Sequence, residues 1–363
     1  ENGETYDDSN TYEGSTNVEN LTLNLSKQKA LGKTSSFTAS NSDIFLLGSH
    51  EVEDGQTVAH NETVGSLGFS GSTLNFATSS HQMSVTGDAT FDISSQLVGA
   101  GTLIADNTTL HGASESFSGT VVSNDTTTIY NVKALGTGKL ETTDLAFKGA
   151  NGEFVNTVNG DKAISEETSY HVLIGSHKVV DDQLIHSNIS YASDAILNVN
   201  STTIDAGSTL KVVDANVEGS NTQLGSEVSF TNTNNLADYA VLTIQSTDKN
   251  PIKGISLSSV DSFAIVELDG LRTDGKKTEY VLDENHDNLG YKGWIRITNA
   301  NLTLQSNHSN HGFSIGTEGN VYVAGSSPVT LGMFGWSSDG SKGVLDLTQF
   351  QFTSVGTQTP ALN

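Results

Sequence analysis

The sequence has no cysteine, only three prolines among its 363 residues, and aromatic side chains at only 7% of positions. The absence of cysteine excludes a disulfide scaffold and any metal site with thiolate ligands. No apolar run approaches the roughly 20 residues that a membrane-spanning helix needs. Scarce proline together with abundant serine, threonine and asparagine favours one long repetitive β domain over several domains joined by linkers.

Basic residues are also scarce, because 17 lysines and arginines stand against 42 aspartates and glutamates, for a formal net charge of −25. Such a chain is a poor candidate for a nucleic-acid partner, and an anionic membrane surface would repel it. Arg272 and Arg296 are the only arginines. This limits the bidentate capture of sulfate, phosphate or carboxylate groups.

The chain is rich in short strand-like runs. Runs of about five residues with alternating apolar and polar side chains, separated by turn residues, are typical of β-strands, and they follow one another closely over residues 64–132 and 196–233. No stretch has the spacing of an amphipathic helix. Asn-Gly and Asp-Gly pairs are too few to close every strand pair as a hairpin. The sequence therefore predicts an all-β solenoid in which each turn pairs with the turn beneath it.

A 37-residue internal repeat organises the chain. Residues 98–121 align without a gap on residues 135–158, with eight identities in 24 positions. The identical pairs are Gly99 and Gly136, Gly101 and Gly138, Leu103 and Leu140, Gly112 and Gly149, Ala113 and Ala150, Phe117 and Phe154, Thr120 and Thr157, and Val121 and Val158. A self-match at fixed period predicts units that stack on one another.

Two stretches interrupt this regular pattern, at residues 159–187 and 269–294, and both carry more charge than their surroundings. We expect a single domain over residues 1–363 with these stretches inserted as loops, since insertions into a solenoid emerge on one face and often form the binding face. Residues 321–352 are rich in aromatic side chains. We assign them to a C-terminal cap over the exposed last turn.

The motif GTL-x(6)-L-x-G-x(4)-FSGTV at residues 101–121 resembles the passenger-associated repeat of bacterial autotransporters, and IDAGSTLKV at residues 204–212 is similar to their passengers. The resemblance implies a right-handed, three-faced parallel β-helix with ~22 residues per turn, within the usual range of solenoid repeats. It also implies a passenger displayed at the bacterial cell surface or secreted, whose C-terminal translocator barrel is absent from this chain. Many such passengers are adhesins, some aggregate cells, and some are proteases or lipases.

Motifs for catalysis are missing. The chain lacks the GDSGS of passenger proteases, HExxH, a Walker loop and a Rossmann fingerprint. A glycan-cleaving β-helix enzyme would need two carboxylates at a set separation. Asp181 with Asp182 and Asp283 with Glu284 are candidates, but neighbours on one strand point to opposite faces. We therefore expect no enzyme, and a polysaccharide-cleaving activity is the least favoured reading.

The histidines predict no metal site. His308 and His311 lie in the segment NHSNHG, and His171 and His177 lie in the first interrupting stretch. Zinc would require three or four converging ligands, so solvated polar loops explain these residues better. We expect neither a metal nor another cofactor.

The residues that favour binding lie mostly in the second interrupting stretch. Tyrosine and tryptophan can stack on a sugar face, and polar side chains can hydrogen-bond sugar hydroxyls. The candidate ligand-binding residues are Arg272, Lys276, Lys277, Tyr280, Asp283, Glu284, His286, Tyr291, Trp294, Lys178, Asp181 and Asp182. We expect an adhesin that binds host glycans, such as glycosaminoglycans, or extracellular matrix proteins. The alternative is a self-associating protein whose polar face pairs with another copy and drives cell aggregation and biofilm formation.

Overall fold

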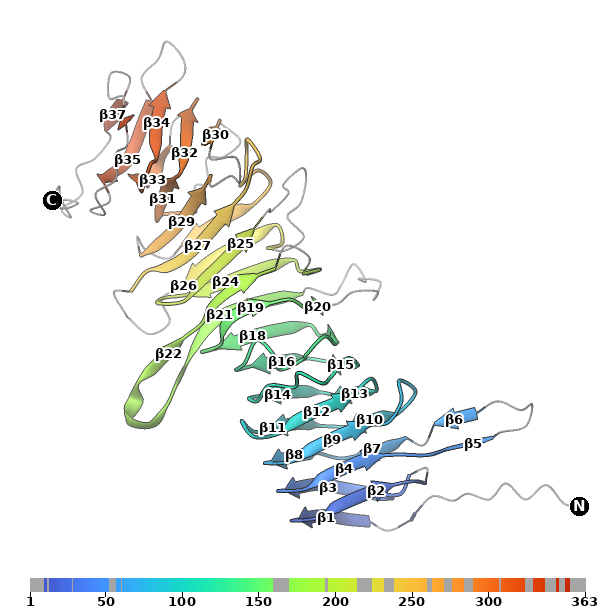
Figure 1. Ribbon diagram of the computed structural model, residues 1–363. Coiled ribbons are helices and arrows are strands. Elements are labelled where there is room, and N and C mark those ends of the chain that lie inside the picture. Colours follow the sequence, from blue (N-terminus) through green and yellow to red (C-terminus); the bar gives the residue numbers. More distant parts are fainter. Residues whose placement is uncertain are drawn as a thin grey trace, which may run out of the picture. The chain divides into compact units, whose positions relative to one another are not determined.

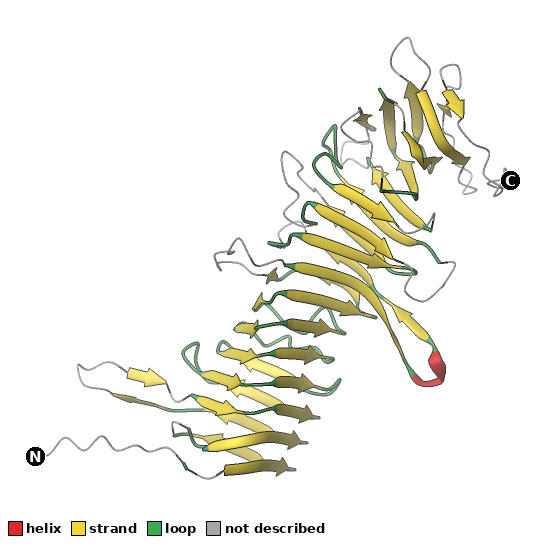
Figure 2. Ribbon diagram, turned by 180° about the vertical axis from the view of Figure 1, so that it is seen from behind, coloured by secondary structure: helices red, strands yellow, loops and turns green. Residues whose placement is uncertain are grey.

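The computed structural model describes residues 10–11, 13–27, 29–51, 57–59, 61–158, 170–192, 195–213, 224–231, 238–259, 263–270, 276–283, 290–306, 308–323, 329–336, 344–345 and 350–352. The chain forms two compact units, Glu1–Tyr170 (unit 1) and His171–Asn363 (unit 2). In the described ranges the one helical element is the 3-10 turn η1 (Val180–Asp182), red in Figure 2. No helix there is long and apolar enough to span a membrane.

Most described strands of unit 1 form three parallel sheets that the chain visits in turn (Figure 1). The first contains β1 (Glu13–Glu19), β3 (Lys33–Ser40), β8 (Leu67–Ser70), β11 (Asp88–Phe91), β14 (Asn107–Leu110), β16 (Thr126–Ile129) and β18 (Asp144–Lys148). The second contains β7 (Glu62–Val64), β10 (Gln82–Val85), β13 (Thr102–Ala105), β15 (Thr120–Ser123), β17 (Lys139–Glu141) and β20 (Thr157–Val158). The third contains β2 (Thr22–Leu25), β4 (Asp43–Leu46), β9 (Thr73–Phe76) and β12 (Gln96–Gly99). A further strand, β19 (Asn151–Phe154), follows β18 in the chain and belongs to none of these three sheets.

Unit 2 follows the same plan. One sheet holds β21 (His171–Lys178), β24 (Ser201–Asp205), β26 (Glu227–Thr231) and β28 (Ser256–Ser259). The next holds β23 (Asn188–Tyr191), β25 (Thr209–Val213), β27 (Ala240–Gln245), β29 (Ala264–Asp269), β31 (Trp294–Thr298), β33 (His308–Ile315), β35 (Val329–Trp336) and β37 (Phe350–Phe352). The last holds β30 (Thr278–Leu282), β32 (Ala300–Leu304), β34 (Asn320–Val323) and β36 (Val344–Leu345).

Strands stacked within each unit pair in parallel, as in β8 with β11 and β27 with β29. Two hairpins are antiparallel: β5 (Ser49–Glu51) with β6 (Thr57–Ala59), and β21 with β22 (Leu184–His186). The predicted class, an all-β parallel β-helix with three faces, is confirmed. Because both units share this plan, the expectation of a single domain stays a prediction.

The 37-residue repeat corresponds to two coils of the helix. Leu103 pairs with Val121, which pairs in turn with Leu140. The coil length is therefore 121 − 103 = 18 and then 140 − 121 = 19 residues, which together give 37. The coils in the repeat are thus shorter than the ~22 residues per turn that the resemblance implies.

The interior of unit 1 is filled by side chains that alternate inward along each strand. In the first sheet, Phe69 packs between the tilted rings of Phe37 and Phe91, with ring centroids 6.1 and 5.0 Å away, and all three rings are buried. The same column continues with Leu110 and Ile129 on the next two coils. The period-two pattern of the sequence is therefore the direct cause of a continuous apolar column.

The stretches expected as loops contain regular strands. The described part of residues 159–187 includes an antiparallel hairpin, in which Lys178 pairs with Leu184 and Ser176 with His186. It reaches beyond the stacked strands of unit 2 in Figures 1 and 2. Within residues 269–294, β30 pairs in parallel with β32 along its whole length. The expected cap at residues 321–352 contains parts of β34 to β37, but its aromatic side chains beyond Tyr322 lie outside the described ones.

Candidate functional site

Three of the predicted ligand-binding residues lie at the tip of the β21–β22 hairpin. Lys178, Asp181 and Asp182 are all exposed, and Lys178 Nζ lies 3.4 Å from Asp182 Oδ1. Asp181 and Asp182 both have left-handed backbone conformations, with φ of 67° and 59°, which reverse the chain at the tip. An exposed ion pair of this kind adds little stability. These residues thus form a solvated turn on a projecting hairpin.

Tyr280 and Tyr291 are core residues. Each is at most 1% exposed. The Tyr280 hydroxyl donates to the carbonyl oxygens of Ser246 and Asp269, and the Tyr291 hydroxyl donates to those of Ala264 and Trp294. Burial raises the pKa of both phenols. Since ring and hydroxyl are enclosed, both tyrosines tie neighbouring coils together, and neither presents a face to a ligand.

The other residues of the second stretch are dispersed. Lys276 is exposed, Asp283 is half-buried, and Lys277 Nζ lies 3.1 Å from a carboxylate oxygen of Glu318. Arg272, Glu284 and His286 lie outside the described residues. Only Trp294, half-buried on β31, belongs to a larger polar surface.

The histidines also have separate positions. His171 Nε2 lies 2.8 Å from Thr203 Oγ1 on the next coil, and His311 is buried with its ring 5.9 Å from that of Tyr291. His177 lies in the hairpin, and the side chain of His308 is outside the described ones. Across the described ranges, no three His, Cys, Asp or Glu side chains are grouped as a metal site would require.

The outward side of β25, β27, β29 and β31 in unit 2 presents aromatic and charged side chains in register. We call this surface the β25–β31 face. One row across it is Thr209, Val241, Ile265 and Trp294; the next is Lys211, Thr243, Glu267 and Arg296; the third is Val213, Gln245, Asp269 and Thr298. Ile265 is only 5% exposed, so it belongs to this register but not to the accessible surface. Because paired strands lie about 4.8 Å apart and alternate residues about 6.6 Å apart, the three rows span about 14 Å in each direction.

Both carboxylates of this face are held by neutral donors. Glu267 accepts hydrogen bonds from the hydroxyls of Thr243 and Thr298, at 3.2 and 2.7 Å. Asp269 accepts from the amide groups of Gln245 and Asn299, at 3.2 and 2.9 Å. These bonds fix the carboxylates and occupy much of their acceptor capacity.

The cations of the face are not held in this way. Arg296 is the register neighbour of Glu267, yet no hydrogen bond or ion pair engages its guanidinium among the described residues, and its Nε is buried without a partner. A buried unpaired donor costs about 1–3 kcal/mol, so pairing within the described chain does not account for the position of this arginine. Lys211, in the same row, likewise has no partner in the described chain.

An aromatic edge borders the rows. The ring of Tyr239, which is 42% exposed, packs edge-on against Phe263 at a centroid distance of 5.6 Å. The two residues precede β27 and β29 by one residue, so they lie two positions before Val241 and Ile265 and on the same side of the strands. Trp294 on β31 adds an indole beside this edge.

The sequence identified Trp294 but not Lys211, Glu267 or Tyr239 as part of a site. Alternation along each strand does show which side chains point outward. The register does not follow from alternation, because the paired positions Leu210, Leu242, Val266 and Ile295 are separated by 32, 24 and 29 residues. Loops of such unequal length hide which residues become neighbours.

Comparisons of the chain with protein-family models, with curated proteins and with solved structures find no match.

Proposed function

We propose that this protein is an adhesin of a bacterial surface that binds acidic glycan chains, such as the glycosaminoglycans of host tissue and matrix, through the β25–β31 face. The observation that carries the proposal is the Arg296 guanidinium, which lies on an outward-facing surface beside Trp294 and has no partner in the described chain. The carboxylates nearby already accept hydrogen bonds. The donors left for a ligand therefore favour one that supplies carboxylate or sulfate oxygens.

The spacing on β31 fits a sugar ring with an acidic substituent. Trp294 and Arg296 are two residues apart on the same side of the strand, which corresponds to about 6.6 Å. A sugar ring stacked on the indole would place a substituent near the guanidinium. Hydroxyl and amide groups of Thr243, Gln245 and Thr298 line the neighbouring positions and can bond sugar hydroxyls.

The high negative charge of the whole chain shapes this binding. A net charge of −25 repels an acidic polymer at long range. Local hydrogen bonds and stacking must then supply the affinity, so we expect only a modest dependence on salt. A binder that worked by general charge attraction would instead lose affinity steeply as salt increases.

The test is binding of the purified chain to heparin, chondroitin sulfate, a neutral dextran and matrix proteins. We expect saturable binding to the acidic glycans, and we expect Arg296→Gln and Trp294→Ala each to weaken it by about tenfold, the loss of one charge-assisted or stacking contact of about 1.4 kcal/mol. Lys253→Gln is the matched control, because Lys253 is an exposed cation of the same unit away from the face. Equal binding of dextran, or an equal loss in the control, would exclude the proposed site.

Self-association is a second candidate, favoured by the first sheet of unit 1. Its outward row contains Thr38, Gly68, Thr90, Thr109 and Thr128 on successive strands in register. A flat row of hydroxyls could pair with the same row of another copy through many weak bonds. Sedimentation of cells that display the chain tests this candidate: Thr109→Lys should disperse clumped cells, and cells that never clump would exclude it.

A further inference from the structure

The third sheet of unit 1 stops at β12, and the next two coils cross that face as turns. Phe117 forms only an isolated bridge with Gly99, and residues 132–137 form turns. Lys133 closes this region: its carbonyl oxygen accepts from the N–H groups of Ser114 and Gly136, and its own N–H donates to Asn131 Oδ1 at 2.9 Å. The next strand at this place in the coil, between a strand of the first sheet and a strand of the second, is β19.

A hollow of about 540 Å³ lies over this break, and we call it the coil hollow. It is lined by Glu115, Val132, Lys133, Gly136, Thr137, Asn151, Gly152, Glu153 and Val155. All of these residues belong to unit 1, so the hollow is independent of the β25–β31 face. Its size lies within the range of small-ligand or side-chain pockets.

The floor of the coil hollow is apolar. Of its two valines, Val155 is 48% exposed and Val132 is buried. Gly152 keeps the floor open, since its φ of +127° suits glycine and a β-carbon there would lie 3.0 Å from Val132 Cγ2. An exposed valine next to a hollow gives an aliphatic guest a surface to cover.

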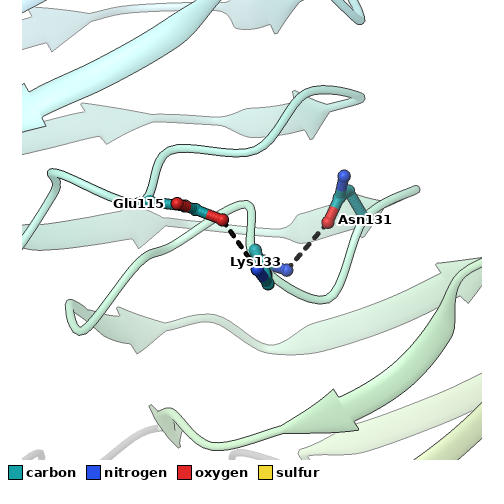
Figure 3. Close-up of polar contacts among 3 residues, drawn as sticks. All are labelled: Glu115, Asn131 and Lys133. Atoms are coloured by element: carbon teal, nitrogen blue, oxygen red, sulfur yellow. Dashed lines mark hydrogen bonds and ion pairs between the residues drawn. The ribbon is translucent and has the colours of Figure 1, made fainter.

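Charges surround this floor unequally. Lys133 Nζ lies 2.7 Å from Glu115 Oε1, and a dashed line in Figure 3 marks this ion pair. This ion pair lowers the pKa of Glu115 and raises the pKa of Lys133, so the pair stays charged and mutually neutralised. Glu153 is exposed and has no hydrogen bond or ion pair within the described chain. The rim therefore keeps the net negative charge of one carboxylate, that of Glu153.

We propose that the coil hollow binds a basic side chain, lysine above all, of a protein partner. The aliphatic stem of lysine covers Val132 and Val155, and its ammonium reaches the Glu153 carboxylate, as long cationic side chains do on apolar surfaces that border an acid. The charge of −25 on the chain also attracts basic partners from a distance. The site thus gives the chain a protein contact that differs in chemistry from its glycan face.

The test is an NMR titration of the deuterated full chain with a capped glycine-lysine-glycine tripeptide, followed at the amides of Gly136 and Gly152. A second tripeptide with norleucine in place of lysine keeps the stem and removes the charge. We expect saturable shifts with the lysine peptide and binding of the norleucine peptide that is roughly two- to fivefold weaker, as for one exposed charge pair. Equal binding of both peptides, or no saturable shift, would overturn the proposal.

Three variants separate the site from general charge attraction. Glu153→Gln should lower the affinity for the lysine peptide to that for the norleucine peptide, and Thr137→Trp should abolish binding by filling the hollow from its exposed rim. Asp43→Asn removes an equal charge from an exposed position on β4 of the same unit and should change nothing. Equal losses in Glu153→Gln and Asp43→Asn would show that the peptide responds only to net charge, and the site would be rejected.

Discussion

Gly138 packs directly against the ring of Phe117: a β-carbon at Gly138 would lie 2.8 Å from Phe117 Cδ1. The same relationship occurs two coils earlier, where a β-carbon at Gly101 would lie 2.4 Å from Cδ1 of Phe76. Gly101 and Gly138, a matched pair of the 37-residue repeat, therefore each meet a phenylalanine ring of an earlier coil. The repeat preserves glycine because the ring of an earlier coil occupies the space of a side chain.

Gly138→Ala should destabilise unit 1 by about 1–3 kcal/mol, because overpacking forces the neighbouring atoms to move. The added methyl would also lie 2.7 Å from the carbonyl oxygen of Gly119 and 2.9 Å from that of Leu135. Both tryptophans, Trp294 and Trp336, belong to unit 2. Because tryptophan fluorescence would therefore report on unit 2, urea unfolding of unit 1 should be followed by far-UV circular dichroism.

Gly68→Ala is the matched control for this steric argument. A β-carbon at Gly68 would have as its nearest neighbour the Cγ2 of Thr38, at 3.6 Å, which is an ordinary contact. We expect the free energy of unfolding of this variant to stay within about 0.5 kcal/mol of that of the parent. Equal destabilisation by Gly68→Ala and Gly138→Ala would show that the Phe117 ring does not explain the effect, since the loss of glycine flexibility by itself favours the folded state.

Phe69→Ala should destabilise unit 1 by about 3–5 kcal/mol, as is usual for a buried phenylalanine. Phe69 lies between Phe37 and Phe91 in the buried column, so its removal leaves a cavity that borders both rings. Ile93→Ala is the control, because Ile93 is 79% exposed and should change stability by less than about 0.5 kcal/mol. A loss below 1.5 kcal/mol for Phe69→Ala would mean that the column collapses to fill the gap.

Much of the fold followed from the sequence, because alternation fixes which side chains are buried. The runs predicted over residues 196–233 include β24, β25 and β26. The sequence did not predict that one 37-residue repeat spans two coils of the helix. Coils that differ in detail, such as those of Leu103 and Val121, pair as neighbours, and only alternate coils share enough identities to be recognised. A sequence self-match reports the period of similarity and not the period of the helix.

The candidate site was predicted less well. High charge in residues 269–294 suggested a binding loop, but TEYVL at residues 278–282 alternates buried and outward side chains and forms β30. Tyr280 is therefore part of the core, and local charge gave no warning of this. Arg296 and Glu267 become neighbours only through the register of β29 with β31. Such long-range pairing depends on loop lengths that a single sequence does not constrain.

Asp92 should make unit 1 more stable as pH rises through the acid range. Its carboxylate accepts from the hydroxyls of Ser95 and Ser70 and from the N–H groups of Gly71 and Ser94. Partial burial acts to raise its pKa, but these four hydrogen bonds outweigh burial and hold the pKa below 3.8. The stabilisation is present above the unfolded-state pKa and is lost as pH falls through the lower, folded-state pKa.

The variant Asp92→Asn isolates this contribution. It should cost about 1 kcal/mol at neutral pH, where charge-assisted bonds are lost, and the difference from the parent should shrink as pH falls below about 4. Unfolding midpoints measured in urea over this range provide the comparison. A difference that stays constant with pH would show that the four bonds act equally on both protonation states.

Glu62 should have the opposite pH dependence. Its side chain is 1% exposed and accepts hydrogen bonds from the N–H groups of Ala30 and Leu31, at 2.7 and 2.9 Å. Burial raises its pKa above 4.5 in spite of these two bonds, so its contribution to stability falls as pH rises from 4.5 through the folded-state pKa.

In Glu62→Gln one N–H loses its acceptor, which should cost about 1–3 kcal/mol, and the pH-dependent part should vanish. Urea midpoints of parent and variant between pH 4.5 and about 7 test the sign: if the parent gains stability relative to the variant as pH rises, the two N–H donors outweigh burial and the carboxylate is a stabilising anion.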